Sequence, residues 1–306
     1  MELVEARRIW DEAPHNAFTD LVRFRGSWYC TFREDRNHWA PGASGKIRVI
    51  RSADGESWAS AALIRGEGDL RDPKLSIAPG NRLMLIYFRR FNPHRYPERE
   101  ERQFVQFSED GERWSEAVKI GFPNEWLWRV SWHEGRAYGV SHGGQEGRPP
   151  FSEPRSGRVV VSADGLEFAP LADAGCGGES TIRFAPHGTA YCLRRGRDNR
   201  GWWGRSSAPY DQWAWKEMNV AIGGPEFIIL PELRMVAAVR LYDGAERTSV
   251  CRIDPETGTL TEALELPSGG DTSYAGLALH AGLLWVSYYS SHEEKTAVYL
   301  ARVRLE

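Results

Sequence analysis

Three residues of this chain have the types and positions that glycoside chemistry requires. Asp72 lies in the apolar run LRDPKLSI, Glu179 lies at the start of GESTIRF, and Tyr274 lies in TSYAGLAL. Cleavage of a glycosidic bond needs one carboxyl group that protonates the leaving oxygen and a second group that acts as nucleophile or base. A tyrosine can be the nucleophile if a carboxylate takes its proton, because free tyrosine ionises near pH ~10. Glu179 could take that proton; alternatively, Tyr274 only bonds to a carboxylate, and two acids carry out inverting or retaining chemistry.

The elements that must position these residues are marked by a repeated cassette. SADGESW (52–58), SEDGERW (108–114) and SADGLEF (162–168) lie 56 and 54 residues apart, and three runs of alternating apolar and polar residues precede each copy. This period is typical of a four-stranded propeller blade. Asp-Gly suits a tight hairpin turn, whereas a calcium loop would need more oxygen ligands than each copy offers. The cassettes are therefore predicted to be structural turns between the third and fourth strands.

The three-run pattern recurs six times along the chain. It predicts an all-β fold, a six-bladed β-propeller of four-stranded antiparallel blades, in a single domain over residues 1–306. The last blade lacks a fourth strand, and residues 3–10 are expected to supply it and so close the ring, which removes exposed sheet edges. The blades are expected at about 14–65, 66–122, 123–174, 175–222, 223–267, and 268–306 with 3–10.

Polar residues stand at the start of the innermost strand of each predicted blade. These strands begin at the same rim, so their first residues should converge on one central pocket. Arginines follow several second strands near that rim, and their planar fork suits a carboxylate or sulfate, or they neutralise the acids there. The rim candidates from this pattern are His15, Asn16, Asp20, Asp69, Arg71, Asp72, Glu125, Trp126, Glu179, Glu226, Asp271 and Tyr274. The clustered arginines are Arg33, Arg36, Arg71, Arg89, Arg90, Arg194, Arg195 and Arg240.

The cassettes resemble the Asp-box of sialidases, and further motifs extend the resemblance. Asp72 and Pro73 match the Asp-Pro that opens the second blade of that family, and Tyr274 matches the tyrosine of its sixth blade. Glu179 is followed fifteen residues later by Arg194, and Arg33 follows the second strand of the first blade. The resemblance implies a six-bladed propeller in which Tyr274 is the nucleophile and Glu179 its activator. It also implies that Asp72 touches the substrate and that arginines hold a substrate carboxylate.

The chain departs from the sialidase pattern at several matching positions. Ala17 stands where the family has its first arginine, Glu226 where it has its third, and Tyr289 where it has a carboxylate beside the tyrosine. The family's acid/base aspartate has no match after Arg33, where His38 could take its role. These departures favour a sugar other than sialic acid. The catalytic candidates are Tyr274, Glu179 and Asp72, and the substrate-binding candidates are Arg33, Arg71, Arg194, Glu125, Trp126, His15, Glu226, Asp271, Arg240 and Tyr289.

Composition excludes some partners. The formal net charge of −3 and the pI near 6.3 give no electrostatic reason to expect nucleic acid or an anionic membrane. The start MELVEARRIW has no apolar segment typical of a leader, so a cytoplasmic location is expected, or a secreted or periplasmic one if a leader has been removed. The four cysteines are expected to be buried thiols, and the histidines form no zinc motif, so neither a metal nor another cofactor is expected.

The leading hypothesis is a sialidase-like glycoside hydrolase. It would cleave a terminal sugar, because the central channel of a propeller is a blind pocket. That sugar could be neutral or acidic. Its partner would be a glycan or glycoside, and the oligomeric state is not predicted. The alternatives are a glycan-binding propeller without activity, and a lyase that removes a proton α to a uronate carboxyl group.

Overall fold

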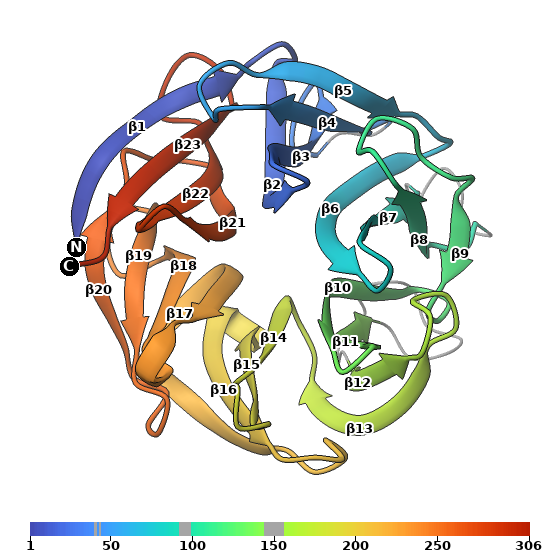
Figure 1. Cartoon of the computed structure of the whole chain (residues 1–306), viewed down its shortest axis with the longest axis vertical. Helices are drawn as coiled ribbons and strands as arrows, with labels where there is room; N and C mark the ends of the chain where they lie inside the picture. Colours follow the sequence, from blue (N-terminus) through green and yellow to red (C-terminus); the bar gives the residue numbers. More distant parts are fainter. Residues whose placement is uncertain (40–41, 43, 92–98, 144–155) are drawn as a thin grey trace.

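Antiparallel sheets set around a central axis make up the fold, which a computed structural model describes for residues 1–39, 42, 44–91, 99–143 and 156–306 (Figure 1). Two short 3₁₀ helices, η1 (Arg197–Asn199) and η2 (Pro231–Leu233), are the only helices in these ranges. Among the described residues no helix has the length and apolar character to span a membrane. The all-β prediction is confirmed.

Three of the sheets contain four consecutive strands each. The strands of the first are β2 (His15–Phe24), β3 (Ser27–Asp35), β4 (Lys46–Ser52) and β5 (Ala59–Ile64). Those of the second are β6 (Asp69–Ala78), β7 (Arg82–Arg90), β8 (Arg102–Ser108) and β9 (Val118–Ile120). Those of the third are β10 (Glu125–His133), β11 (Arg136–Gly143), β12 (Ser156–Ser162) and β13 (Ala169–Cys176).

A seven-stranded sheet occupies the region predicted for the fourth and fifth blades. Its central strand β17 pairs with β16 through residues 214–221 and with β18 through residues 222–229, so one continuous strand serves both blades. The prediction of separate four-stranded sheets therefore holds elsewhere but not here. The strands in order are β14 (Ser180–Phe184), β15 (Ala190–Arg195), β16 (Arg200–Ser206), β17 (Ala214–Ile229), β18 (Met235–Leu241), β19 (Arg247–Ile253) and β20 (Leu260–Glu265).

The two ends of the chain meet in the last sheet. It has the order β1 (Glu2–Trp10), β23 (Ala297–Arg304), β22 (Leu283–Ser290) and β21 (Thr272–His280), with β1 antiparallel to β23. This pairing was predicted for the N-terminal strand, and Figure 1 shows both termini at this edge of the ring. Trp28 of β3 stacks on Trp285 of β22 with ring centroids 4.4 Å apart, so aromatic packing joins the first and last sheets.

The repeated cassettes form turns at the outer strands. In the first copy, Asp54 Oδ1 accepts hydrogen bonds from the amides of Glu56 and Ser57 (2.8 and 3.1 Å), and Ser52 Oγ accepts one from the amide of Gly55 (2.8 Å). These bonds satisfy backbone donors that the tight turn leaves unpaired. The same carboxylate-to-amide bonds recur at Asp110, Asp164 and Asp254.

The cassette glycines allow close contact between neighbouring sheets. Gly111 has φ +78°, and a Cβ there would come within 2.2 Å of the Tyr29 ring of the preceding sheet. Gly80, in the same sheet as Gly111, has almost the same φ of +79° but no atom within 4 Å of a Cβ.

We predict that Gly111→Ala destabilises the fold more than Gly80→Ala. Left-handed backbone should cost either variant about 1–2 kcal/mol. Gly111→Ala must in addition displace Tyr29, which adds about 1–3 kcal/mol of overpacking. Urea unfolding of both variants measures the difference. Equal losses would mean that the sheets do not depend on this contact.

Candidate active site

A pocket of about 690 Å³ opens at the centre of the ring. Its wall combines aromatic rings, arginines and carboxyl groups from inner strands and from the loops beside them, a composition typical of small-molecule sites. Its lining residues are Phe18, His38, Trp39, Arg71, Asp72, Arg90, Trp126, Trp128, His142, Gly177, Gly178, Glu179, Arg195, Gly196, Arg197, Asp198, Asn199 and Tyr274.

The inner strands present these side chains through a shared β-bulge. The pairing register shifts at the same place in β2, β6, β10, β17 and β21, so two residues face one residue of the neighbouring strand. A bulge bends the strand and redirects a side chain. The residue pairs in the bulges are Phe18–Thr19, Asp72–Pro73, Trp128–Arg129, Gly224–Pro225 and Tyr274–Ala275.

Three pocket residues in these bulges have strained backbone. Phe18, Asp72 and Tyr274 have φ of 65°, 47° and 51°, in the left-handed region that residues with a Cβ seldom adopt. Each such residue costs about 1–3 kcal/mol unless its surroundings hold it, and such strain is concentrated at functional sites. The strain coincides with two of the three predicted catalytic residues.

Tyr274 and Glu179 form a direct pair at the pocket wall. The Tyr274 hydroxyl donates a hydrogen bond of 2.6 Å to Glu179 Oε1, and Arg195 Nη1 lies 2.8 Å from the same oxygen and 3.2 Å from the hydroxyl. The amide of Gly224 donates to Glu179 Oε2 at 2.7 Å. Asn199 Oδ1 accepts from the Arg195 guanidinium and fixes its orientation.

The electrostatics of this pair favour a neutral phenol beside an ionised carboxylate. Burial raises the pKa of Glu179, but Arg195, the Tyr274 hydroxyl and the Gly224 amide together hold that pKa below its ordinary value. Burial and the Glu179 charge raise the pKa of Tyr274 well above 10, against the opposing effect of Arg195 and Arg240. In this resting state, Glu179 can accept the tyrosine proton and Arg195 can stabilise the resulting phenolate.

Asp72 is a buried carboxyl group at the same pocket. Only 4% of the residue is exposed, and among the described residues no group makes a hydrogen bond to its Oδ1. Burial raises the pKa of Asp72 to about 6, even though Arg71 and Lys74 oppose the shift; the Glu179 charge adds to it. A carboxyl group with a pKa near neutrality is suited to donate and then recover a proton.

Buried charges form the floor of the pocket. Arg129 lies against both carboxylate oxygens of Asp20 (2.8 and 2.9 Å), and its Nε is 2.5 Å from Glu226 Oε2. Arg183 pairs with the other oxygen of Glu226. Lys74 donates to the Thr19 carbonyl at 3.1 Å, and burial lowers its pKa to about 8. This network separates the pocket from a second hollow, of about 410 Å³, that is lined in part by Asp20, Arg129 and Arg183.

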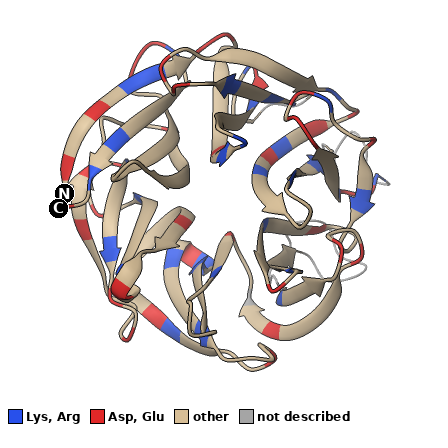
Figure 2. Cartoon of the chain, in the orientation of Figure 1, with Lys and Arg blue, Asp and Glu red and all other residues tan. Residues whose placement is uncertain are grey.

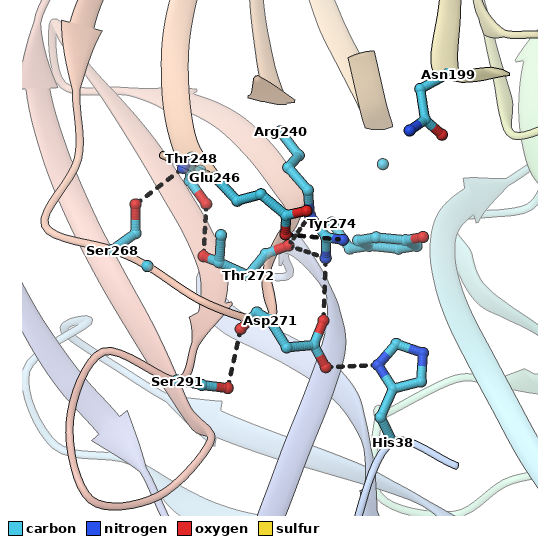
Figure 3. A network of polar contacts seen from close by, with 12 residues as sticks. His38, Asn199, Arg240, Glu246, Thr248, Ser268, Asp271, Thr272, Tyr274 and Ser291 are labelled. Atoms are coloured by element: carbon cyan, nitrogen blue, oxygen red, sulfur yellow. Dashed lines mark hydrogen bonds and ion pairs between the residues drawn. The ribbon is translucent and has the colours of Figure 1, made fainter. Parts of the chain in front are cut away.

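A second polar network lies beside the pocket, around Asp271 (Figure 3). Asp271 Oδ1 accepts from the Tyr289 hydroxyl (2.7 Å) and Arg240 (3.1 Å). Its Oδ2 lies 2.5 Å from His38 Nδ1 and 3.1 Å from His15 Nε2. Burial raises the pKa of Asp271, but its hydrogen bonds to His15, His38 and Tyr289 and the His38 charge hold it far below the ordinary value. Of these residues, His38 also lines the pocket.

The structure brings together only some of the residues expected to contact substrate. Arg71 and Trp126 line the pocket with the three catalytic candidates, whereas His15, Asp271, Arg240 and Tyr289 form the network beside it. The remaining four lie among structural partners. Arg33 pairs with Asp35 and Asp69, Glu125 with Arg158 and Ser141, Glu226 with Arg129 and Arg183, and Arg194 with the Ala174 carbonyl and the Trp215 ring.

Arg195, rather than Arg194, is the arginine of the Tyr274–Glu179 pair. Neighbouring residues of a strand point to opposite faces. The amide of Arg195 donates to the Glu179 carbonyl at 2.8 Å, so these two residues face each other across the hairpin. That register is the signal that would have selected Arg195. Phe18 and Trp39 also line the pocket and were not among the predicted site residues.

We predict that Asp72→Asn stabilises the protein at neutral pH but not in acid. The folded state raises the pKa of Asp72 to about 6, so its stability contribution is full below the unfolded pKa near 4 and is lost as pH rises through 6. Asparagine stays neutral and should avoid that loss, which is on the order of 3 kcal/mol above pH 7. Urea unfolding at pH 4 and pH 7.5 measures the difference. A variant less stable than the parent at pH 7.5 would show that the ionised carboxylate stabilises the fold.

Comparison with known proteins supports the fold. No protein-family model and no curated protein sequence matches the chain. Among solved structures, it is similar to a protein of unknown function from Dyadobacter fermentans, with a TM-score of 0.85, 17% identity, and coverage of 100% of this chain and 99% of that chain. It is also similar to the α-L-arabinanase of Penicillium chrysogenum, solved with arabinobiose, with a TM-score of 0.77, 13% identity, and coverage of 100% and 99%.

A sialidase is among the similar structures. The sialidase of Trypanosoma rangeli, solved with the inhibitor DANA, has a TM-score of 0.69 and 12% identity over 95% of this chain and 55% of that chain. This chain thus spans about half the length of that sialidase. The resemblance to sialidases is confirmed at the level of the fold, which this chain shares with both the arabinanase and the sialidase.

Proposed function

We propose that the protein is a glycoside hydrolase that cleaves a terminal sugar in the central pocket. The observation that carries this proposal is the Tyr274–Glu179–Arg195 contact in the same pocket as the buried Asp72. The charged floor supports action at a chain end, because a pocket closed below cannot thread a polymer. The arabinanase and the sialidase that share the fold are also carbohydrate-active by name.

The proposed reaction has two steps. In the first, Tyr274 Oη attacks the anomeric carbon while its proton passes to Glu179, and the bond to the leaving oxygen breaks as Asp72 protonates that oxygen. In the second, ionised Asp72 takes a proton from water, whose oxygen attacks the anomeric carbon and breaks its bond to Tyr274 Oη, and the tyrosine oxygen recovers its proton from Glu179. Each step inverts the anomeric carbon, so the reaction overall retains its configuration.

The pocket does not assemble the carboxylate clamp that the sialidase resemblance implies. Arg33 and Arg194 have structural partners, and Ala17 and Glu226 stand where the family has its first and third arginines. An acidic group on the sugar would instead meet Arg71, which is only 3% exposed and lies at the pocket with its guanidinium over the Phe18 ring. We therefore propose a terminal sugar other than sialic acid, neutral or with an acidic group placed toward Arg71.

We predict that Tyr274→Phe and Glu179→Gln abolish most activity on a productive substrate. A panel of aryl glycosides, including α-L-arabinofuranosides, uronides and sialosides, identifies that substrate. Loss of the nucleophile should lower kcat by about a thousand-fold or more, and loss of the base by about 10²–10⁴. Glu125→Gln is the control, because Glu125 lies outside the pocket and pairs with Arg158.

Three results of this panel would contradict the proposal. Turnover unchanged in both variants would exclude the pair from the chemistry. Glycan binding without turnover of any substrate would favour a binding propeller. An unsaturated product from a uronate-containing glycan would identify a lyase.

We predict a bell-shaped pH dependence of kcat/KM. The acid must be protonated and the base ionised, and the pKa of Asp72 is about 6 whereas that of Glu179 lies below its ordinary value. The value of kcat/KM should therefore fall as the pH rises above about 6, where Asp72 loses its proton. On the acid side it should fall only at pH values below the ordinary pKa of glutamate, where Glu179 gains a proton. Asp72→Asn should remove the limb near pH 6 when the leaving group is a good one. If the decrease of kcat/KM near pH 6 persists in this variant, another group is the proton donor.

A further inference from the structure

We propose that His15, His38 and Asp271 form a binding site for a divalent transition-metal ion of the Zn²⁺ type. The ligand atoms of these three residues, two imidazole nitrogens and one carboxylate oxygen, all lie within 4.8 Å of one another. They come from β2, the loop after β3, and the residue before β21. No local zinc motif marks these residues, because the fold and not their spacing in the sequence brings them together. The proposal does not depend on the proposed hydrolase activity.

The ligand distances fit such an ion after a small movement of one side chain. An ion with four ligands at ~2.0–2.1 Å holds them ~3.3 Å apart. His15 Nε2 and Asp271 Oδ2 are 3.1 Å apart, near that value, whereas His38 Nδ1 is 2.5 Å from the same oxygen. The His38 side chain is 36% exposed and follows the end of β3, so it is the ligand able to move outward.

The surroundings hold the other two ligands in place. Asp271 Oδ1 accepts from Tyr289 and Arg240, which leaves Oδ2 for His15 and His38. Figure 3 shows the contact between Asp271 and His38. Such contacts orient the ligands of metal sites and strengthen binding. His15 is buried in β2 at 5% exposure, so its ring has little freedom to move.

The local charge tolerates a dication despite three arginines nearby. Arg240 pairs with Asp271 and lies 4.0 Å from Glu246, and Arg33 pairs with two aspartates. Both signs are interspersed around the ring rather than separated (Figure 2). Each guanidinium near the cluster therefore has a carboxylate other than the ligand Asp271: Arg33 has Asp35 and Asp69, Arg71 has Asp69 at 3.8 Å, and Arg240 has Glu246.

The ligand types select the class of ion. Two imidazoles and one carboxylate suit Zn²⁺, Co²⁺ or Ni²⁺, whereas Ca²⁺ and Mg²⁺ prefer oxygen ligands throughout. Three protein ligands leave at least one coordination position free, as in catalytic zinc sites. Because His38 lines the pocket, that position lies at the pocket wall and could take a sugar hydroxyl or water.

Co²⁺ titration of the chain, prepared without a polyhistidine tag, tests the site directly. We expect one Co²⁺ per chain with the visible absorption bands of a four- or five-coordinate ion, and Zn²⁺ should displace it. His38→Ala and Asp271→Asn should weaken binding by about 10-fold or more. His187→Ala, at an exposed histidine outside the cluster, is the matched control and should bind as the parent does.

Binding without these bands, or binding equal in His38→Ala and the parent, would overturn the proposal, as would no uptake at all. The cluster would then be only a hydrogen-bonded arrangement around Asp271. Because His38 is partly exposed, its variant should keep the fold, and thermal unfolding without metal checks this. Zn²⁺ should raise the Tm of the parent and of His187→Ala, but not that of His38→Ala.

Discussion

The ion pairs of Arg129 determine what the centre of this ring can contain. The guanidinium is 4% exposed and joins β10 to Asp20 of β2 and to Glu226 of β17, and its Nη2 donates to the Ala275 carbonyl of β21 at 3.3 Å. Buried charges are costly unless each has a partner, so removing one member would leave the others uncompensated. Trp128, the residue before Arg129, lines the central pocket, whereas Arg129 itself lines the second hollow, so the network lies between the two.

The floor and the wall of the pocket come from neighbouring residues of the same strands. In β10, Trp128 lines the pocket and the next residue, Arg129, belongs to the charged floor. In β6, Asp72 lines the pocket, and Lys74, two residues later, belongs to the floor. The bulge places both, because it adds a residue to the inner strand where the strand reaches the axis. Backbone strain at Tyr274 and Asp72 is thus tied to packing that also positions their side chains.

The sequence predicted the repeat and much of the site for different physical reasons. The repeated cassette marks a local turn, so the strands that precede each turn could be predicted from its spacing. Tyr274, Glu179 and Asp72 stand at the starts of inner strands, and in a propeller these starts converge on the central axis. The sequence pattern placed both Arg194 and Arg195 near the rim, but only the strand register shows that the Arg195 side chain points to Glu179, and Arg194 was selected instead. Arg33 and Glu226 have the charge of site residues, but nearby opposite charges hold them elsewhere. The cluster of His15, His38 and Asp271 joins the two ends of the chain, which no local pattern reveals.

In the proposed reaction, Tyr274 forms a covalent bond to the sugar. The direct measurement is mass spectrometry of the digested protein after reaction with a 2-fluoro glycoside of the productive sugar, which slows release of the glycosyl group. We expect the added mass on the peptide that carries Tyr274, and no added mass in Tyr274→Phe. Added mass on a carboxylate such as Asp72, or turnover with inversion of the anomeric carbon, would contradict it.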